Sequence, residues 1–345
     1  MGNRSVFRVA VDFEQVDACI EASRACAELT SQSGADRSEV AGRYTRAWQE
    51  ALSSQVSRTI LDHAKVEPTD LSSLITSGLL GKDLPQDKTG FLARKALGSG
   101  QPRFAQFVEE ARSVADTVAD TAAQAASAYL PVCLPGSPIP VTVRFAGFAL
   151  ADSFSPPGGP VINLGDMFFL VHEKIIGDPG ELKLQKTLRL IRRVIAHELH
   201  HVGLGRLISF PETPNEEWLL KFIISEGVAT ALMLPFTEDD AYYHERWAQH
   251  SGRLDRYVWE LSDALAESQE RIPPDVWEKW VMNVGAAYYV GASMTQAIDQ
   301  AFGRERLLEA ITGVPSFFKL YNSAATKWRL PVLINVHDWA DGKGQ

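Results

Sequence analysis

Long apolar runs and cysteine are both scarce in this sequence. No stretch of about 18 consecutive apolar residues occurs, so no membrane-spanning helix is predicted. Cysteine occurs 3 times, at Cys19, Cys26 and Cys133, which is too few and too scattered for a disulfide framework. The first residues lack the apolar core of a secretory signal, because Asp12 and Glu14 interrupt it. These absences favour a cytoplasmic protein.

Basic residues are also fewer than acidic ones. The chain has 34 Lys and Arg residues against 43 Asp and Glu, which gives a formal net charge of −9. A nucleic-acid or anionic-membrane partner needs a basic surface, so we expect neither partner. With 45% hydrophobic and 22% charged residues in 345, the composition is that of a globular protein with a large core.

The order of the predicted elements favours a mostly α fold of the α+β class. Amphipathic periodicity, interrupted by Gly and Pro, predicts helices over residues 14–30, 37–63, 69–79 and 103–129. The composition changes near Pro131, after which apolar runs predict two strands, at 141–145 and 161–164. We therefore expect a helical N-terminal lobe over residues 1–130 and a second lobe with a small sheet over residues 131–345.

The most informative motif is His197-Glu198-x-x-His201. In an α-helix, positions i and i+4 lie one turn apart on the same side, so both histidines can bind one tetrahedral metal ion. Glu198 lies beside them, where zinc peptidases use a glutamate to move a proton from water to the leaving amine. The motif predicts a zinc site, and the alternative is a helix that carries a cluster of surface histidines.

Residues 181–204 are predicted to form the helix that carries this motif. Apolar residues recur there at i+3 and i+4 and predict one buried stripe: Leu184, Leu188, Ile191, Ile195, Leu199 and Val202. His197 and His201 fall to one side of the stripe, among apolar neighbours, which suits an interior site. His200 groups with Lys186 and three arginines on a polar face, so we predict that His200 is not a ligand.

A catalytic zinc usually takes three protein ligands and leaves one position for water, so a third ligand is needed. The metzincin solution fails, because Leu204 and Leu207 stand where a Gly and a His are required. Glu226 is predicted to lie on the apolar side of a following helix, where an unpaired carboxylate would cost several kcal/mol. A metal would remove that cost. The alternative is a glutamate at a helix end that bonds to a loop.

His197-Glu198-x-x-His201 followed by Ser225-Glu226-Gly227 resembles the gluzincin metallopeptidases, in which a downstream glutamate supplies the third ligand. The resemblance extends over residues 139–320 to bacterial families described as putative zinc-dependent peptidases. It implies a zincin-like catalytic lobe, a Zn²⁺ cofactor and a peptide or protein substrate. The chain departs from thermolysin-like enzymes in the longer interval before Glu226. It also has Thr230 where those enzymes have an aspartate, so the support of the ligands stays unassigned.

A hydrogen-bond donor for the developing oxyanion is the remaining requirement of such a site. The related peptidases carry a Tyr-x-x-Gly that matches Tyr288 and Gly291, so Tyr288 is the preferred donor. His244 and Tyr289 are alternatives, and Tyr288 and Tyr289 also fit a role in bridging core and surface. Residues 161–165 are a candidate edge strand for binding extended substrate, with an ordinary core hairpin as the alternative.

The sequence as a whole predicts a zinc metallopeptidase. His197, His201 and Glu226 are the predicted metal ligands, with Glu198 as general base and Tyr288 as second catalytic residue. One alternative is a zinc hydrolase of an ester or small amide, which shares this chemistry. The other is a catalytically silent zinc-containing scaffold. Glu198 argues against the scaffold, because a structural zinc site normally has Cys or His in its fourth position.

Overall fold

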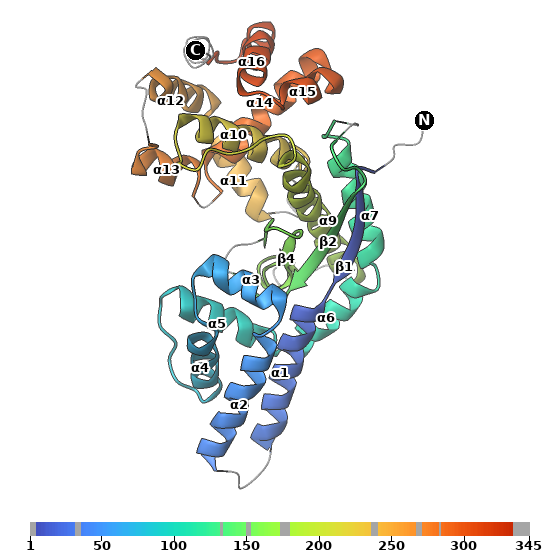
Figure 1. Cartoon of the computed structure of the whole chain (residues 1–345), viewed down its shortest axis with the longest axis vertical. Helices are drawn as coiled ribbons and strands as arrows, with labels where there is room; N and C mark the ends of the chain where they lie inside the picture. The colour runs from blue at the N-terminus through green and yellow to red at the C-terminus, as the bar shows by residue number, and fades with distance from the viewer. Residues whose placement is uncertain are drawn as a thin grey trace. The chain divides into compact units, whose positions relative to one another are not determined.

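The fold is shown in Figure 1 as a computed structural model, which describes residues 5–31, 36–131, 134–149, 153–172, 180–235, 241–266, 271–282 and 284–333. The chain divides into two compact units. Unit 1 comprises Met1–Phe7, Ala123–Ile139 and Ala196–Gln345, and unit 2 comprises Arg8–Ala122 and Pro140–Ile195. Each unit is therefore assembled from segments that are distant in the sequence. The boundary predicted after residue 130 stays a prediction.

The predicted helices at the start of the chain are present in order, but two of them are each divided in two and one further helix occurs over Lys88–Gly98. Their bounds are α1 (Glu14–Ser31), α2 (Arg37–Ala51), α3 (Gln55–Ala64), α4 (Pro68–Leu79), α5 (Lys88–Gly98), α6 (Pro102–Arg112) and α7 (Ala115–Ser127). The helix predicted over residues 37–63 is two helices, because the hydroxyl of Ser54 accepts the Ser57 N–H at 3.1 Å and begins α3 as its N-cap. The helix predicted over residues 103–129 is likewise two.

The hydrophobic core of unit 2 gathers the inner faces of α1 to α5. Trp48 of α2 is fully buried, and Leu71 and Ile75 of α4 lie one turn apart on the face of that helix that enters the core. Val161 joins the same core from the sheet. Cys19 and Cys26 are buried in it as free thiols.

The described residues form one four-stranded sheet in the order β1-β2-β4-β3. Its strands are β1 (Phe7–Asp12), β2 (Ile139–Ala146), β3 (Ser153–Phe154) and β4 (Val161–Asn163). β4 pairs in parallel with β2 and antiparallel with β3. The prediction that residues 161–165 form an exposed substrate-binding edge is therefore wrong, because the backbone of β4 is already paired on both sides.

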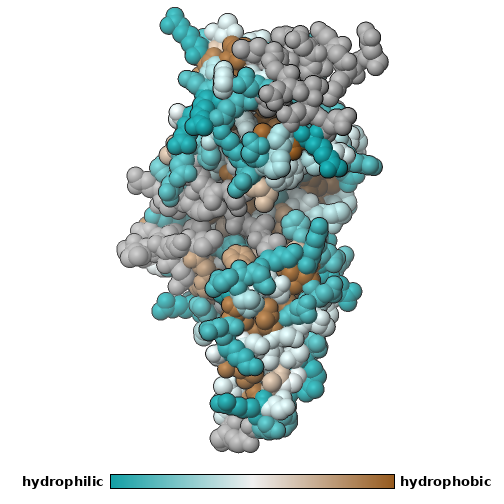
Figure 2. All heavy atoms as spheres, turned by 90° about the vertical axis from the view of Figure 1, so that its left-hand side faces the viewer, coloured by the Kyte–Doolittle hydropathy of each residue, from teal (hydrophilic) through white to brown (hydrophobic). Residues whose placement is uncertain are grey.

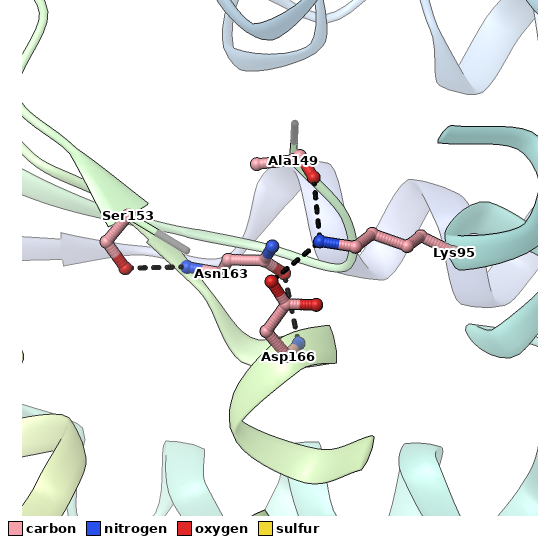
Figure 3. A network of polar contacts seen from close by, with 5 residues as sticks. All are labelled: Lys95, Ala149, Ser153, Asn163 and Asp166. Atoms are coloured by element: carbon pink, nitrogen blue, oxygen red, sulfur yellow. Dashed lines mark hydrogen bonds and ion pairs between the residues drawn. The ribbon is translucent and has the colours of Figure 1, made fainter. Parts of the chain in front are cut away.

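A polar network in unit 2 fixes the chain where β4 leads into α8 (Leu164–Asp166) and the π-helix η1 (Met167–Val171). Lys95 Nζ donates to Asp166 Oδ2 at 2.6 Å and to the carbonyl of Ala149 at 3.1 Å (Figure 3). Asn163 caps the turn by accepting the Asp166 N–H at 3.2 Å, and Ser153 accepts the Asn163 N–H at 3.3 Å. The network joins β3, β4 and α5 through side chains.

Unit 1 is a cluster of helices around α14, which is buried along most of its length. The helices are α10 (Glu216–Ala231), α11 (Ala241–Ser251), α12 (Leu254–Ala266), α13 (Pro274–Trp280), α14 (Ala286–Phe302), α15 (Arg304–Ala310) and α16 (Val314–Trp328). α14 packs against each of the others, most extensively against α10 (Figure 1). Gly227 of α10 and Gly291 of α14 meet at this crossing.

The predicted motif helix is present as α9 (Gly180–Leu204). In its early turns the described residues before Thr187 are exposed or partly exposed, but every residue from Val194 to His200 is buried. The placement of His200 on a polar face is therefore wrong, since its side chain is 0% exposed. A helical wheel divides a helix into an inner and an outer face, and this part of α9 has no outer face.

The predicted fold class is confirmed, since the structure is mostly helical with a small mixed sheet. None of the described helices is both long enough and apolar enough to cross a bilayer. On the face drawn in Figure 2, hydrophobic side chains form small patches between hydrophilic ones.

Candidate metal centre

Two turns of α9 present a pair of histidines to the same point. His197 and His201 are one helical turn apart, and their rings meet edge to face with centroids 4.7 Å apart. Their Nε2 atoms lie 3.0 Å from each other. The i, i+4 spacing therefore brings two nitrogen ligands of the predicted kind into contact.

Glu226 of α10 completes a triangle of ligand atoms. Its Oε2 lies 3.3 Å from His197 Nε2 and 3.2 Å from His201 Nε2. Ligand bonds of about 2.0–2.1 Å in a tetrahedron put neighbouring ligand atoms about 3.3 Å apart. The three measured separations are close to that value, so the geometry fits a zinc ion that touches all three atoms.

The electrostatics of the triangle favour a cation. Burial alone would lower the pKa of His201, but the Glu226 carboxylate, with a smaller effect from Glu198, raises that pKa to about 9. Burial alone would raise the pKa of Glu226, but the two histidines hold it well below its usual range. His197 and Glu226 are each 9% exposed, so little solvent screens this field. A positive charge is stabilised between the three side chains.

The donor set also indicates which metal fits. Two imidazole nitrogens and one carboxylate oxygen match the ligands of catalytic zinc sites. Among the described residues, no further His, Cys, Asp or Glu joins the group. Three protein ligands leave a position for water or substrate, whereas a structural site would be closed by a fourth.

Ser225 contacts one of the predicted ligands, a role that the sequence did not indicate. Its Oγ lies 2.9 Å from His201 Nδ1, on the far side of the ring from the ligand atom Nε2. A hydroxyl that accepts the Nδ1–H leaves a lone pair on Nε2 for a metal, and it fixes the ring orientation. Ser225 stands directly before Glu226 in the sequence, which is the one hint of its role. Its contact with His201, 24 residues earlier, leaves no pattern in the sequence.

Two glycines explain why α10 and α14 approach so closely beside the ligands. A Cβ on Gly227 would lie 2.4 Å from the Gly291 Cα, and a Cβ on Gly291 would lie 2.2 Å from the Ile223 carbonyl oxygen. Only hydrogen fits at either position. Gly227, which follows Glu226, and Gly291, of the Tyr-x-x-Gly segment, therefore form one packing contact. That contact brings α14 next to the triangle.

Tyr288 lies on this approaching helix. Its ring is parallel to that of His197, with centroids 6.4 Å apart and an interplanar angle of 4°. It also meets Phe222 edge to face at 5.8 Å. The neighbouring Tyr289 instead stacks on His250 of α11 at 4.7 Å, and His244 is exposed on α11. Of the three candidate donors, Tyr288 has a ring contact with a predicted ligand.

Glu198 and His200 share the buried part of α9 with the histidine pair. Glu198 is 6% exposed, and its charge acts on His201. Its role as general base stays a prediction. Burial, reinforced by positive charge on His201 and His197, lowers the pKa of His200 to about 3, so this imidazole is neutral. His200 does not belong to the ligand group of the described residues.

Residues 100–329 match the family described as "Putative zinc dependent peptidase (DUF5700)". The matched range contains the triangle, Ser225, both glycines of the helix crossing and Tyr288. No curated protein and no solved structure matches the chain.

Proposed function

We propose that this chain, which belongs to the DUF5700 family of putative zinc-dependent peptidases, is a gluzincin-type metallopeptidase that hydrolyses peptide bonds. The observation that carries the proposal is the triangle of His197 Nε2, His201 Nε2 and Glu226 Oε2, with sides of 3.0, 3.2 and 3.3 Å. The bound metal would be zinc, and the substrate would be a peptide or a protein.

In the proposed mechanism each of these side chains has a separate role. Zinc held by the triangle would supply a Lewis acid that polarises the scissile carbonyl and makes water a better nucleophile. Glu198, on the same buried turn as His197, accepts the proton of the attacking water and returns it to the leaving amine. Ser225 keeps the His201 ring in the orientation that binding requires.

Tyr288 is proposed as the donor to the developing oxyanion. The contact between its ring and that of His197 supports this role, and so does the close crossing of α10 and the helix that carries Tyr288. A phenol O–H that meets negative charge in the transition state typically contributes about 3 kcal/mol. We therefore expect Tyr288→Phe to lower turnover roughly 100-fold and to leave the zinc content unchanged.

The test compares the wild type with Glu198→Gln in two assays, elemental zinc analysis and cleavage of a peptide library. Glutamine keeps the shape of the side chain but cannot take up the proton, so we expect full zinc content with turnover lowered by about 10²- to 10⁴-fold. Equal turnover in both proteins would contradict the assignment of the base. Wild type that binds zinc and cleaves esters but no peptide would indicate the alternative zinc hydrolase.

A further inference from the structure

A pocket of about 250 Å³ opens beside the predicted metal ligands in unit 1. His201 and Glu226 form part of its wall, together with Ser225. A group bound in this pocket therefore contacts two of the three predicted ligands. The chemistry proposed above uses the ligands themselves and assigns no role to this space.

Aromatic rings form one side of the pocket. Trp218 and Phe222, one turn apart on α10, stack at 4.9 Å, and Phe210 lies 5.6 Å from Trp218. Leu204 and Ile208 contribute aliphatic surface at the end of α9 and just beyond it. Phe210 is 40% exposed, and Trp218 and Phe222 are only partly buried. These large apolar side chains thus keep surface available for a ligand.

The charge of the lining restricts the ligand further. His201 and Glu226 are the ionisable residues that line the pocket, and they pair with each other at 3.2 Å. A charged side chain would therefore enter a pocket whose two charged groups are already engaged with each other, and would lose its hydration without gaining a free partner. An apolar side chain meets no such penalty, and an aromatic one gains ring contacts with Trp218 and Phe222.

We propose that this pocket binds an aromatic side chain of the peptide substrate beside the scissile bond. The volume suits one side chain, because pockets for drug-sized ligands measure roughly 300–1,000 Å³. The inference rests on the proposed peptidase function and adds the substrate class: peptides with phenylalanine, tyrosine or tryptophan near the cleavage point. We expect kcat/KM about 10- to 100-fold higher for such peptides than for alanine equivalents.

Gly205 offers a way to fill the pocket without replacing a predicted ligand. It lines the pocket, and a Cβ placed on it would lie 3.2 Å from the His201 carbonyl oxygen and 3.9 Å from that of Val202, which are both backbone atoms. We expect the side chain of Gly205→Leu to occupy part of the space. Trp218→Ala removes the aromatic wall and is a second, independent variant. Trp259→Ala is the matched control, since Trp259 of α12 is 63% exposed and does not line the pocket.

The first readout is binding, measured by ¹⁹F NMR with N-acetyl-4-fluorophenylalanine amide at millimolar concentration. We expect wild type and Trp259→Ala to bind this probe and N-acetylalanine amide not to displace it. Gly205→Leu and Trp218→Ala should each weaken binding at least about tenfold, with zinc content unchanged as the control for folding. Absence of binding to wild type, or equal binding to all four proteins, would overturn the proposal.

The second readout, cleavage of a peptide library, separates this inference from the function on which it rests. An aromatic preference that is present in wild type and lost in Gly205→Leu supports both. Cleavage without an aromatic preference leaves the peptidase standing and overturns the pocket as its substrate site. Binding of the probe without any cleavage leaves an aromatic-binding pocket and contradicts the peptidase.

Discussion

Each unit contains a buried polar cluster, and the two clusters differ in their hydrogen-bonding groups. One pairs donors with acceptors, and the other brings together only atoms that bind a cation. In unit 2, the ammonium of Lys95 meets the Asp166 carboxylate at 2.6 Å and a backbone carbonyl at 3.1 Å, so donors face acceptors (Figure 3). In unit 1, two imidazole nitrogens and a carboxylate oxygen converge within 3.3 Å. All three are atoms that bind a cation. The first cluster is complete within the chain, and the second is arranged for a metal.

This difference predicts different consequences when each cluster is damaged. Removing one partner from a closed, buried network leaves a charge without compensation and should lower stability. Changing a residue around a metal site should alter metal affinity or turnover before it alters the fold. The following predictions test that division, beginning with the largest expected effect.

Lys95→Met should lower the free energy of unfolding by roughly 3 kcal/mol, because it removes the ammonium group that pairs with the Asp166 carboxylate, which is 8% exposed. Urea titration measures this change, and zinc content should not move. The double variant Lys95→Met/Asp166→Leu should recover most of the loss, since no buried charge then remains. A single variant as stable as wild type would show that the network does not support unit 2.

Gly227→Ala should lower the free energy of unfolding by about 2 kcal/mol, because the added methyl group forces α10 and α14 apart. Gly42→Ala is the control, since Gly42 lies inside α2 and a Cβ there meets no atom within 4 Å. That control should gain about 0.5–1 kcal/mol from helix propensity. Equal changes in the two variants, measured in urea, would contradict the close crossing.

Ser225→Ala should raise the dissociation constant for zinc about tenfold, the smallest effect of the three, through loss of the hydrogen bond that orients His201. Competition with a zinc chelator measures it. Ser293→Ala is the matched control, because that hydroxyl donates to the Tyr289 carbonyl within α14. Unchanged zinc affinity in Ser225→Ala would remove Ser225 from the site.

The parts of the fold that the sequence predicted are those set by local periodicity. The recurrence of apolar residues predicted α9 over 181–204, and the structure has it over Gly180–Leu204. The strands predicted at 141–145 and 161–164 correspond to β2 and β4. Helix α5 was not assigned, although Asp87 begins it as an N-cap that accepts the Gly90 N–H at 2.8 Å. Short capped segments carry less periodic signal than a helix of many turns.

The parts that failed depend on contacts between distant segments. The exposed edge assigned to residues 161–165 was wrong because the two-residue strand β3 pairs with β4. The placement of His200 on a polar face was wrong because packing surrounds α9 on every side at that point, which a helical wheel does not represent. The motif spacing predicted His197 and His201, and the apolar side of a following helix predicted Glu226. The packing role of Gly227 and Gly291 became visible only where two helices cross.

The central claim is that His197, His201 and Glu226 hold one zinc ion, and zinc content tests it most directly. Elemental analysis after dialysis should find about one zinc per chain in wild type. Glu217→Gln is the control on the same helix. It should retain the zinc, since Glu217 pairs with Lys221 and is not a predicted ligand. Glu226→Ala should lose it. Wild type without zinc, or Glu226→Ala that keeps zinc as tightly as wild type, would contradict the account.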